Sequence, residues 1–90
     1  KAVVRTSSIA NNTTGVVAGG ADANLSNCTI SGNTTGISSL GGAVIRLYEN
    51  IITSNGTGLS SGGGSILSSN NNQVDGNTIN GVVTGFLTNT

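Results

Sequence analysis

Histidine is absent from this chain, and cysteine occurs once, as Cys28. Without histidine no Cys–His nucleophile can form, and a single cysteine excludes an intrachain disulfide. We therefore expect Cys28 to fill a small position in the core, as unpaired cysteines commonly do.

Charge is also scarce, because only 7% of the residues are Asp, Glu, Lys or Arg and the net charge is 0. Nucleic-acid binding depends on clustered basic side chains, so we expect no nucleic-acid partner. No apolar run approaches the roughly 20 residues that span a bilayer, so we expect no membrane insertion. A chain of 90 residues allows one domain, residues 1–90.

The chain instead contains a repeated phrase rich in Gly, Asn, Ser and Thr. The stretch "SGNTTGISSLGGA" is preceded by "ANNTTGVVAGGA" and followed by "TSNGTGLSSGGGS", at intervals of 21 and 22 residues. Periods of 20–50 residues are typical of solenoids and other repeat architectures. Aliphatic residues recur inside each unit with the in-out alternation of half-buried strands. The predicted core positions are Ile9, Ile30, Ile52, Val74, Val16, Ile37, Leu59, Val82, Leu25 and Leu47.

Each unit therefore contains three short strand-like pieces separated by Gly and Asn. One unit cannot bury its apolar edge alone, but stacked units share a core and main-chain hydrogen bonds. Equivalent strands would stack in parallel, about 4.8 Å apart. The sequence predicts an all-β solenoid of about four coils, in which Ala2, Ala23, Ile45 and Leu67 form a further stacked row.

Asparagine recurs three residues after the reference aliphatic of each unit. An inward Asn at a bend can donate and accept along the stack, and Asn tolerates the left-handed backbone of sharp corners. We expect these residues to be corner residues that form a ladder; a polar binding row is the alternative interpretation. They are Asn12, Asn33, Asn55 and Asn77.

The three acidic residues do not indicate an active site. Asp22, Glu49 and Asp75 fall at different positions of the repeat, whereas glycoside hydrolysis needs two facing carboxylates. Calcium needs six to eight oxygen ligands, commonly several carboxylates, so we expect no catalytic residue, metal or cofactor. Asp22 is expected to form an exposed ion pair with Lys1. Tyr48 is predicted to face outward, where it is a surface residue or stacks on a sugar.

Threonines form a second polar row, Thr14, Thr35 and Thr57. Flat threonine arrays on solenoids can order water, as in ice-binding proteins. The row is short, and Ile79 interrupts it, so corner threonines are the simpler interpretation.

The stretches "TISGNTTGI" and "IITSNGTGL" resemble the coil repeat of right-handed parallel β-helix proteins of the pectin-lyase-like type. The stretch "GGGSILSSNNNQVDGNTING" is similar to the C-terminal coil of secreted bacterial β-helix proteins. The resemblance implies a right-handed parallel β-helix and an extracellular or cell-surface location. The family includes polysaccharide lyases, glycoside hydrolases, phage tailspikes and adhesin-like proteins.

The two ends of the stack differ in sequence. The chain starts in a predicted strand, "KAVVR", without a polar or helical cover, whereas Phe86 and Leu87 are expected to fold over the last coil as a cap. An open end exposes unpaired main-chain groups, which favours self-association or the presence of further coils upstream. We expect a non-enzymatic structural module that self-assembles end to end. The alternatives are a fragment of a carbohydrate-active enzyme and a glycan- or ice-binding module.

Overall fold

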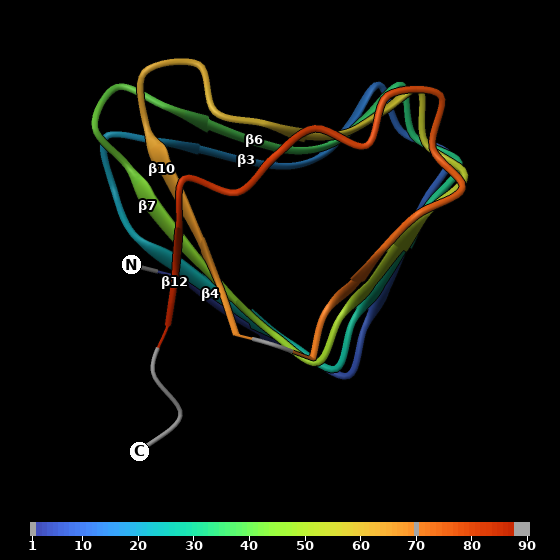
Figure 1. The fold of residues 1–90 in the computed structure, drawn as a ribbon, viewed down its shortest axis with the longest axis horizontal. Helices are drawn as coiled ribbons and strands as arrows, with labels where there is room; N and C mark the ends of the chain where they lie inside the picture. The colour runs from blue at the N-terminus through green and yellow to red at the C-terminus, as the bar shows by residue number, and fades with distance from the viewer. Residues whose placement is uncertain (1, 70, 88–90) are drawn as a thin grey trace.

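The computed structural model describes residues 2–69 and 71–87, which form twelve short β-strands and no helix (Figure 1). Among these residues no helix has the length and apolarity needed to cross a bilayer. The strands are β1 (Ala2–Arg5), β2 (Ser8–Ala10), β3 (Thr14–Gly19), β4 (Ala23–Ser26), β5 (Thr29–Ser31), β6 (Thr35–Leu40), β7 (Val44–Tyr48), β8 (Ile51–Thr53), β9 (Thr57–Ser60), β10 (Ser65–Ser68), β11 (Gln73–Val74) and β12 (Gly85–Phe86).

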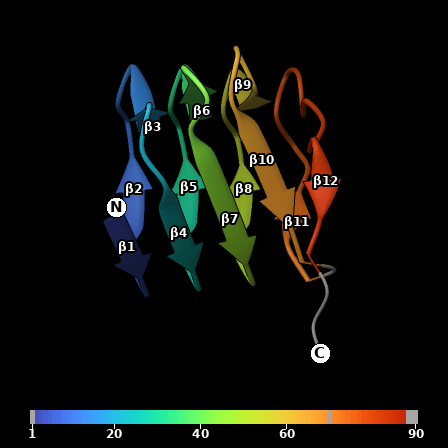
Figure 2. The ribbon, with the colours of Figure 1, turned by 90° about the vertical axis from the view of Figure 1, so that its left-hand side faces the viewer.

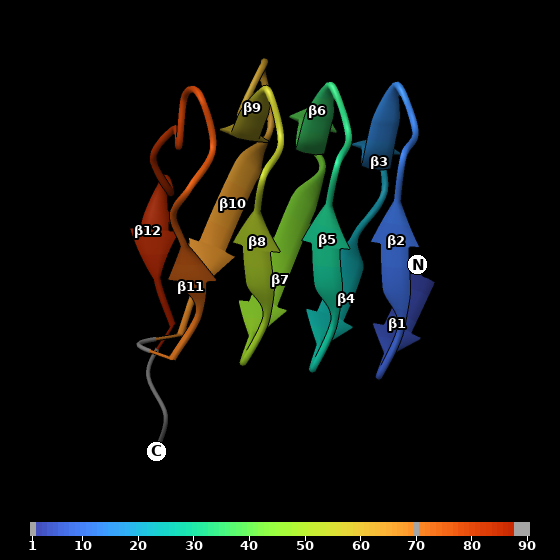
Figure 3. The same ribbon diagram turned by 90° about the vertical axis from the view of Figure 1, so that its right-hand side faces the viewer.

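The strands form three parallel sheets, which are the three sides of a solenoid of about four coils. Sheet A has the order β1-β4-β7-β10-β12, sheet B the order β11-β8-β5-β2, and sheet C the order β3-β6-β9. Seen along the stack, the coils overlay as one three-sided outline (Figure 1). From the two sides, equivalent strands of successive coils lie next to one another (Figures 2 and 3). The predicted all-β parallel solenoid is therefore confirmed.

The core follows from strand alternation, because every second side chain points into the solenoid. Sheet B pairs Ile9 with Ile30, Ile30 with Ile52, and Ile52 with Val74, so each aliphatic residue stacks on its copy. In the two middle coils these side chains are fully buried, whereas Ile9 and Val74 at the ends are half-buried. The buried aliphatic and small residues are Ala18, Ala23, Leu25, Cys28, Ile30, Ile37, Ala43, Ile45, Leu47, Ile52, Leu59 and Ile66.

The corners between the sheets are formed by left-handed residues stacked in columns. Between sheets A and B, the backbone φ is positive at Thr6, Asn27 and Glu49. Between sheets B and C, a second column contains Asn11, Gly32, Ser54 and Gly76. Glycine and asparagine adopt this conformation readily, whereas other side chains are strained in it.

Ser54 is therefore a site where glycine should stabilise the fold. Its φ is 59°, close to the 70° of Gly32 and the 69° of Gly76 in the same column. We expect Ser54→Gly to raise the free energy of unfolding by about 0.5–1 kcal/mol, because relief of strain exceeds the added entropy of the unfolded chain. Urea denaturation followed by circular dichroism measures the change. Ser60→Gly in β9 is the matched control and should destabilise; equal losses in both variants would contradict the strain at Ser54.

The strand register observed in the fourth coil differs from the predicted one by one residue. Ile66, not Leu67, pairs with Ile45 and is fully buried. The chain takes one residue more between Ser68 and Asn72 than between the equivalent Leu47 and Asn50. The predicted alignment ignored this extra residue, which shifts the whole of β10 by one position.

Two predicted roles in the last coil are wrong, that of Val82 as a core residue and that of Phe86 as a cap. Val82 was expected in the core but is 76% exposed, and Val83 packs against the core instead. Leu59 N–H donates to Asn80 O at 3.1 Å, so pairing with sheet C ends before Val82.

Phe86 does not close the end of the solenoid, because its side chain is 74% exposed on β12, the outermost strand of sheet A. No other described strand pairs with the free edge of β12. Leu87 is half-buried, and its N–H donates to Ser68 O at 2.9 Å. The prediction that Phe86 and Leu87 fold over the last coil as a cap is therefore wrong for Phe86.

Candidate functional site

The most developed polar feature is a ladder of asparagine side chains at the corner between sheets B and C. Asn55 Oδ1 accepts hydrogen bonds from both Asn33 N and Asn33 Nδ2, each at 3.0 Å. One coil further on, Asn77 Oδ1 accepts from Asn55 N and Asn55 Nδ2, each at 2.9 Å. Asn33, Asn55 and Asn77 thus each accept from the preceding coil, and Asn33 and Asn55 are 3% exposed.

The same amides also bind the main chain of the preceding coil. Asn33 Nδ2 donates to Ile9 O at 3.2 Å, and Asn55 Nδ2 donates to Ile30 O at 3.0 Å. Both carbonyls belong to the central residues of the strands β2 and β5. Because each amide satisfies groups on two coils, the ladder fixes both the corner and the stacking register.

The two ends of this ladder differ. At the first coil, Asn12 is exposed; its N–H donates to Asn33 Oδ1 at 2.9 Å, and no described residue donates to Asn12 Oδ1. At the last coil, Asn80 Oδ1 accepts from Asn77 N at 3.3 Å and Asn77 Nδ2 at 3.1 Å. Asn80 therefore occupies the place that an asparagine of a further coil would take.

A second ladder lies at the corner between sheets A and B, and sequence reasoning missed it. Asn50 Oδ1 accepts from Cys28 N at 3.0 Å, and Asn72 Oδ1 accepts from Asn50 N at 2.8 Å and Asn50 Nδ2 at 3.0 Å. Asn50 Nδ2 also donates to Leu25 O at 3.0 Å. The signal was present, because Cys28, Asn50 and Asn72 are spaced by 22 residues.

Cys28 occupies the place of an asparagine at the start of the second ladder. Its side chain is 1% exposed, and Sγ lies 3.3 Å from Ser26 O and 3.5 Å from Val4 O. The thiol thus approaches main-chain carbonyls of the same and the preceding coil, a weaker version of what Asn50 Nδ2 does.

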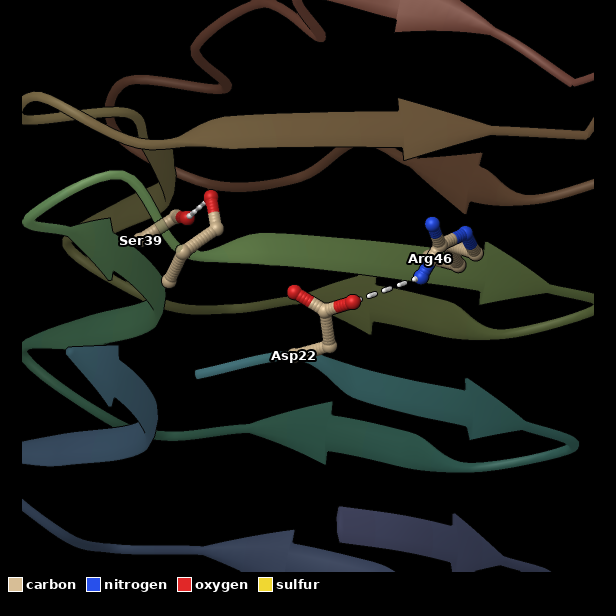
Figure 4. Close-up of polar contacts among 4 residues, drawn as sticks. Asp22, Ser39 and Arg46 are labelled. Atoms are coloured by element: carbon tan, nitrogen blue, oxygen red, sulfur yellow. Dashed lines mark hydrogen bonds and ion pairs between the residues drawn. The ribbon is translucent and has the colours of Figure 1, made fainter. Parts of the chain in front are cut away.

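The charged residues that the structure describes lie on the outer surface. Arg46 Nη1 is 3.5 Å from Asp22 Oδ2, and both side chains are partly exposed (Figure 4). The expected partner of Asp22, Lys1, lies outside the described residues. An exposed pair of this kind contributes about 0–1 kcal/mol. Over residues 2–69 and 71–87 there is no pocket and no group of three or more His, Cys, Asp or Glu that could hold a metal.

The bend after sheet C is fixed by a buried hydroxyl. Ser39 Oγ donates to Ala43 O at 3.0 Å, and Ser39 is completely buried (Figure 4). This hydrogen bond holds the chain between β6 and β7, just before the strand that carries Arg46 and Tyr48.

The outer face of sheet A collects the remaining polar candidates. The strand register aligns Val3, Asn24 and Arg46 in one row. Tyr48 is half-buried on β7 beside Ser26 in the next outward row. Asn24 Oδ1 is buried and has no hydrogen-bond partner among the described residues, which is unusual for a polar atom.

The threonine row is present in sheet C. Register pairs Thr14 with Thr35 and Thr35 with Thr57, and a bridge pairs Thr57 with Ile79. The three threonines are half-buried, so they form a short row rather than a broad exposed array.

Glu49 and Asp75 lie at separate corners. Glu49 belongs to the left-handed column between sheets A and B, while Asp75 directly follows β11 and accepts a hydrogen bond from Gln73 Nε2 at 3.2 Å. Neither Glu49 nor Asp75 lies on β4, the strand that begins directly after Asp22. The three acids therefore belong to three different local environments.

Comparison with known protein families agrees with the stacked coils. No curated protein and no solved structure matches the chain. The family model described as a right-handed β-helix region matches residues 1–90, so the chain belongs to the right-handed β-helix family.

Proposed function

We propose that this chain is a non-enzymatic structural module of a secreted or cell-surface protein, and that it associates end to end through its first coil. The observation that carries the proposal is the position of the sheet edges. β1, β2 and β3 are each the terminal strand of their sheet, and all three belong to the first coil. The N-terminal end thus presents three parallel edges together (Figures 2 and 3). Unpaired strand edges are templates for further strands.

The first ladder gives this end a matching polar group. Asn12 Oδ1 is an acceptor in line with the ladder, and it accepts from no described residue. An amide from an added strand would extend the same pattern.

The opposite end is already covered in part by side chains of the chain itself. Asn80 Oδ1 ends the ladder, and Thr84 Oγ1 accepts from Ile66 N at 2.8 Å and donates to Ile66 O at 3.0 Å. A hydroxyl thus satisfies main-chain groups that a further strand would otherwise bind. The proposed association therefore involves the N-terminal end.

The edge strands β1, β2 and β3 carry one charged residue, Arg5 of β1. The net charge is 0, and the exposed apolar residues Val3 and Val17 lie on the edge strands β1 and β3. Natural edge strands avoid pairing through charged side chains, especially lysine.

Light scattering over a concentration series tests the proposal. We expect the mass of the wild-type chain to rise with concentration, and Val3→Lys to remove that rise, because lysine places charge at the edge of β1. Val82→Lys is the matched control: Val82 is 76% exposed in the last coil, and the substitution should leave association unchanged. A wild-type chain that stays monomeric throughout contradicts the proposal, as does equal inhibition by both lysines.

A carbohydrate-binding module is the second candidate function. It is supported by the outer face of sheet A, where the half-buried Tyr48 offers an aromatic surface two residues from Arg46, the partner of Asp22. Sugars bind to such surfaces through hydrogen bonds and aromatic stacking. A glycan array tests this, and a signal that Tyr48→Ala abolishes would favour it. Thermal hysteresis would instead favour ice binding by the threonine row, and acidic clusters in upstream coils would favour a carbohydrate-active enzyme.

A further inference from the structure

Two Asn–Gly dipeptides in this chain have opposite environments. They are Asn55–Gly56 and Asn80–Gly81. Asparagine followed by glycine is chemically labile, because the glycine nitrogen can approach the side-chain amide without obstruction from a Cβ. The nitrogen attacks Cγ, ammonia leaves, and a five-membered succinimide forms; water then opens the ring to aspartate or isoaspartate.

At Asn55–Gly56 every participant in this reaction is held by hydrogen bonds. Asn55 is 3% exposed, and its Nδ2 donates to Ile30 O and Asn77 Oδ1. Its Oδ1 accepts from Asn33. The attacking nitrogen is also occupied, since Gly56 N–H donates to Asn33 O at 2.9 Å. The nitrogen and Cγ cannot meet unless the ladder opens.

At Asn80–Gly81 the same participants are free. Both residues are exposed, and no described residue accepts a hydrogen bond from Gly81 N–H or from Asn80 Nδ2. Asn80 is held only through its oxygens: Oδ1 accepts from Asn77, and the main-chain O accepts from Leu59 N at 3.1 Å. The leaving amide nitrogen and the attacking nitrogen thus belong to exposed residues and have no partner among the described residues.

We propose that Asn80 is a site of spontaneous deamidation, while Asn55 is protected by the ladder. The reaction needs only water: one C–N bond to ammonia breaks, the succinimide C–N bond forms, and hydrolysis places a carboxylate at residue 80. It replaces the terminal amide of the ladder by an anion and changes the net charge of the chain from 0 to −1.

The two products differ in their effect on the end of the solenoid. In the aspartate product a carboxylate oxygen still accepts from Asn77 N and Nδ2, so the ladder keeps its terminal acceptor. In the isoaspartate product an additional methylene enters the main chain at residue 80. That change displaces the carbonyl that accepts from Leu59 N–H and loosens the last coil.

Peptide mass spectrometry after incubation of the folded chain at mildly alkaline pH tests the proposal. We expect the mass increase of NH2-to-OH exchange in the Asn80–Gly81 peptide, at least about a hundredfold faster than in the Asn55–Gly56 peptide, because Asn55 reacts only in locally opened molecules. In denaturant both peptides should deamidate at similar rates. Asn80→Gln should suppress the signal, because its longer side chain disfavours ring closure.

Asp75–Gly76 can form the same succinimide, but its hydrolysis products have the same mass as the starting aspartate. An increase in peptide mass therefore reports the deamidation of asparagine and not the reaction of Asp75. Circular dichroism of the incubated sample shows that the strands persist. Equal rates at Asn55 and Asn80 in the folded chain would overturn the proposal. So would an Asn80 rate in the folded chain far below its rate in denaturant.

Discussion

Replacement of Asn55 by alanine should lower the free energy of unfolding by about 3–5 kcal/mol, because the amide satisfies several buried groups at once. Without it, Asn33 N–H and Asn33 Nδ2 lose their buried acceptor, and Ile30 O loses a side-chain donor. Asn77 Oδ1 loses the donor Asn55 Nδ2 and keeps only the main-chain N–H of residue 55. Each unsatisfied buried group costs about 1–3 kcal/mol. A loss of this size is a large part of the total stability of a small domain.

Urea denaturation followed by far-ultraviolet circular dichroism measures this loss. Asn12→Ala is the matched control, because Asn12 belongs to the same column but is exposed and receives no side-chain hydrogen bond from a described residue. We expect Asn12→Ala to cost less than about 1 kcal/mol. If the two substitutions cost the same, the ladder is not a source of stability.

The second large effect is expected for Ile52→Ala in the centre of sheet B. Ile52 is fully buried and lies in register between Ile30 and Val74. Truncation leaves a cavity between coils that cannot collapse without breaking the stack, so we expect a loss of about 2–5 kcal/mol.

The adjacent residue supplies the control for this experiment. Ile51 points outward and is 42% exposed, so Ile51→Ala should cost less than about 1 kcal/mol. The two variants lose the same atoms at neighbouring positions of one strand. Similar shifts of the urea midpoint in both would mean that the alternation of β8 is wrong.

The repeat made most of the fold predictable because equivalent residues of a solenoid neighbour their own copies. The row from Ile9 to Val74 and the corner positions of Asn33 and Asn55 could be read from spacing alone. Strand alternation then decided which side chains face inward. The Asp22–Arg46 pair was not predictable in this way, because it joins residues at different positions of the repeat.

The errors lie where the repeat is broken. Ile66 and Leu67 are adjacent aliphatic residues, and only the extra residue before Asn72 decides that Ile66 faces inward. Val82 and Val83 present the same ambiguity at the end of the chain, where no further copy constrains the register. The second ladder was missed because its first member, Cys28, has a thiol in place of the amide that Asn50 and Asn72 carry.

The stacking register also has a genetic consequence. Every interface between middle coils is built from the same pairs of positions, such as Ile30 on Ile52 and Asn33 on Asn55. A duplication of one whole 22-residue unit would therefore insert a coil that already carries its own core residue, corner residues and ladder amides. Insertion of a single residue into a strand reverses the faces of the side chains that follow it. Length variation among such genes should thus occur in whole units, with small insertions confined to corners such as the one after Ser68.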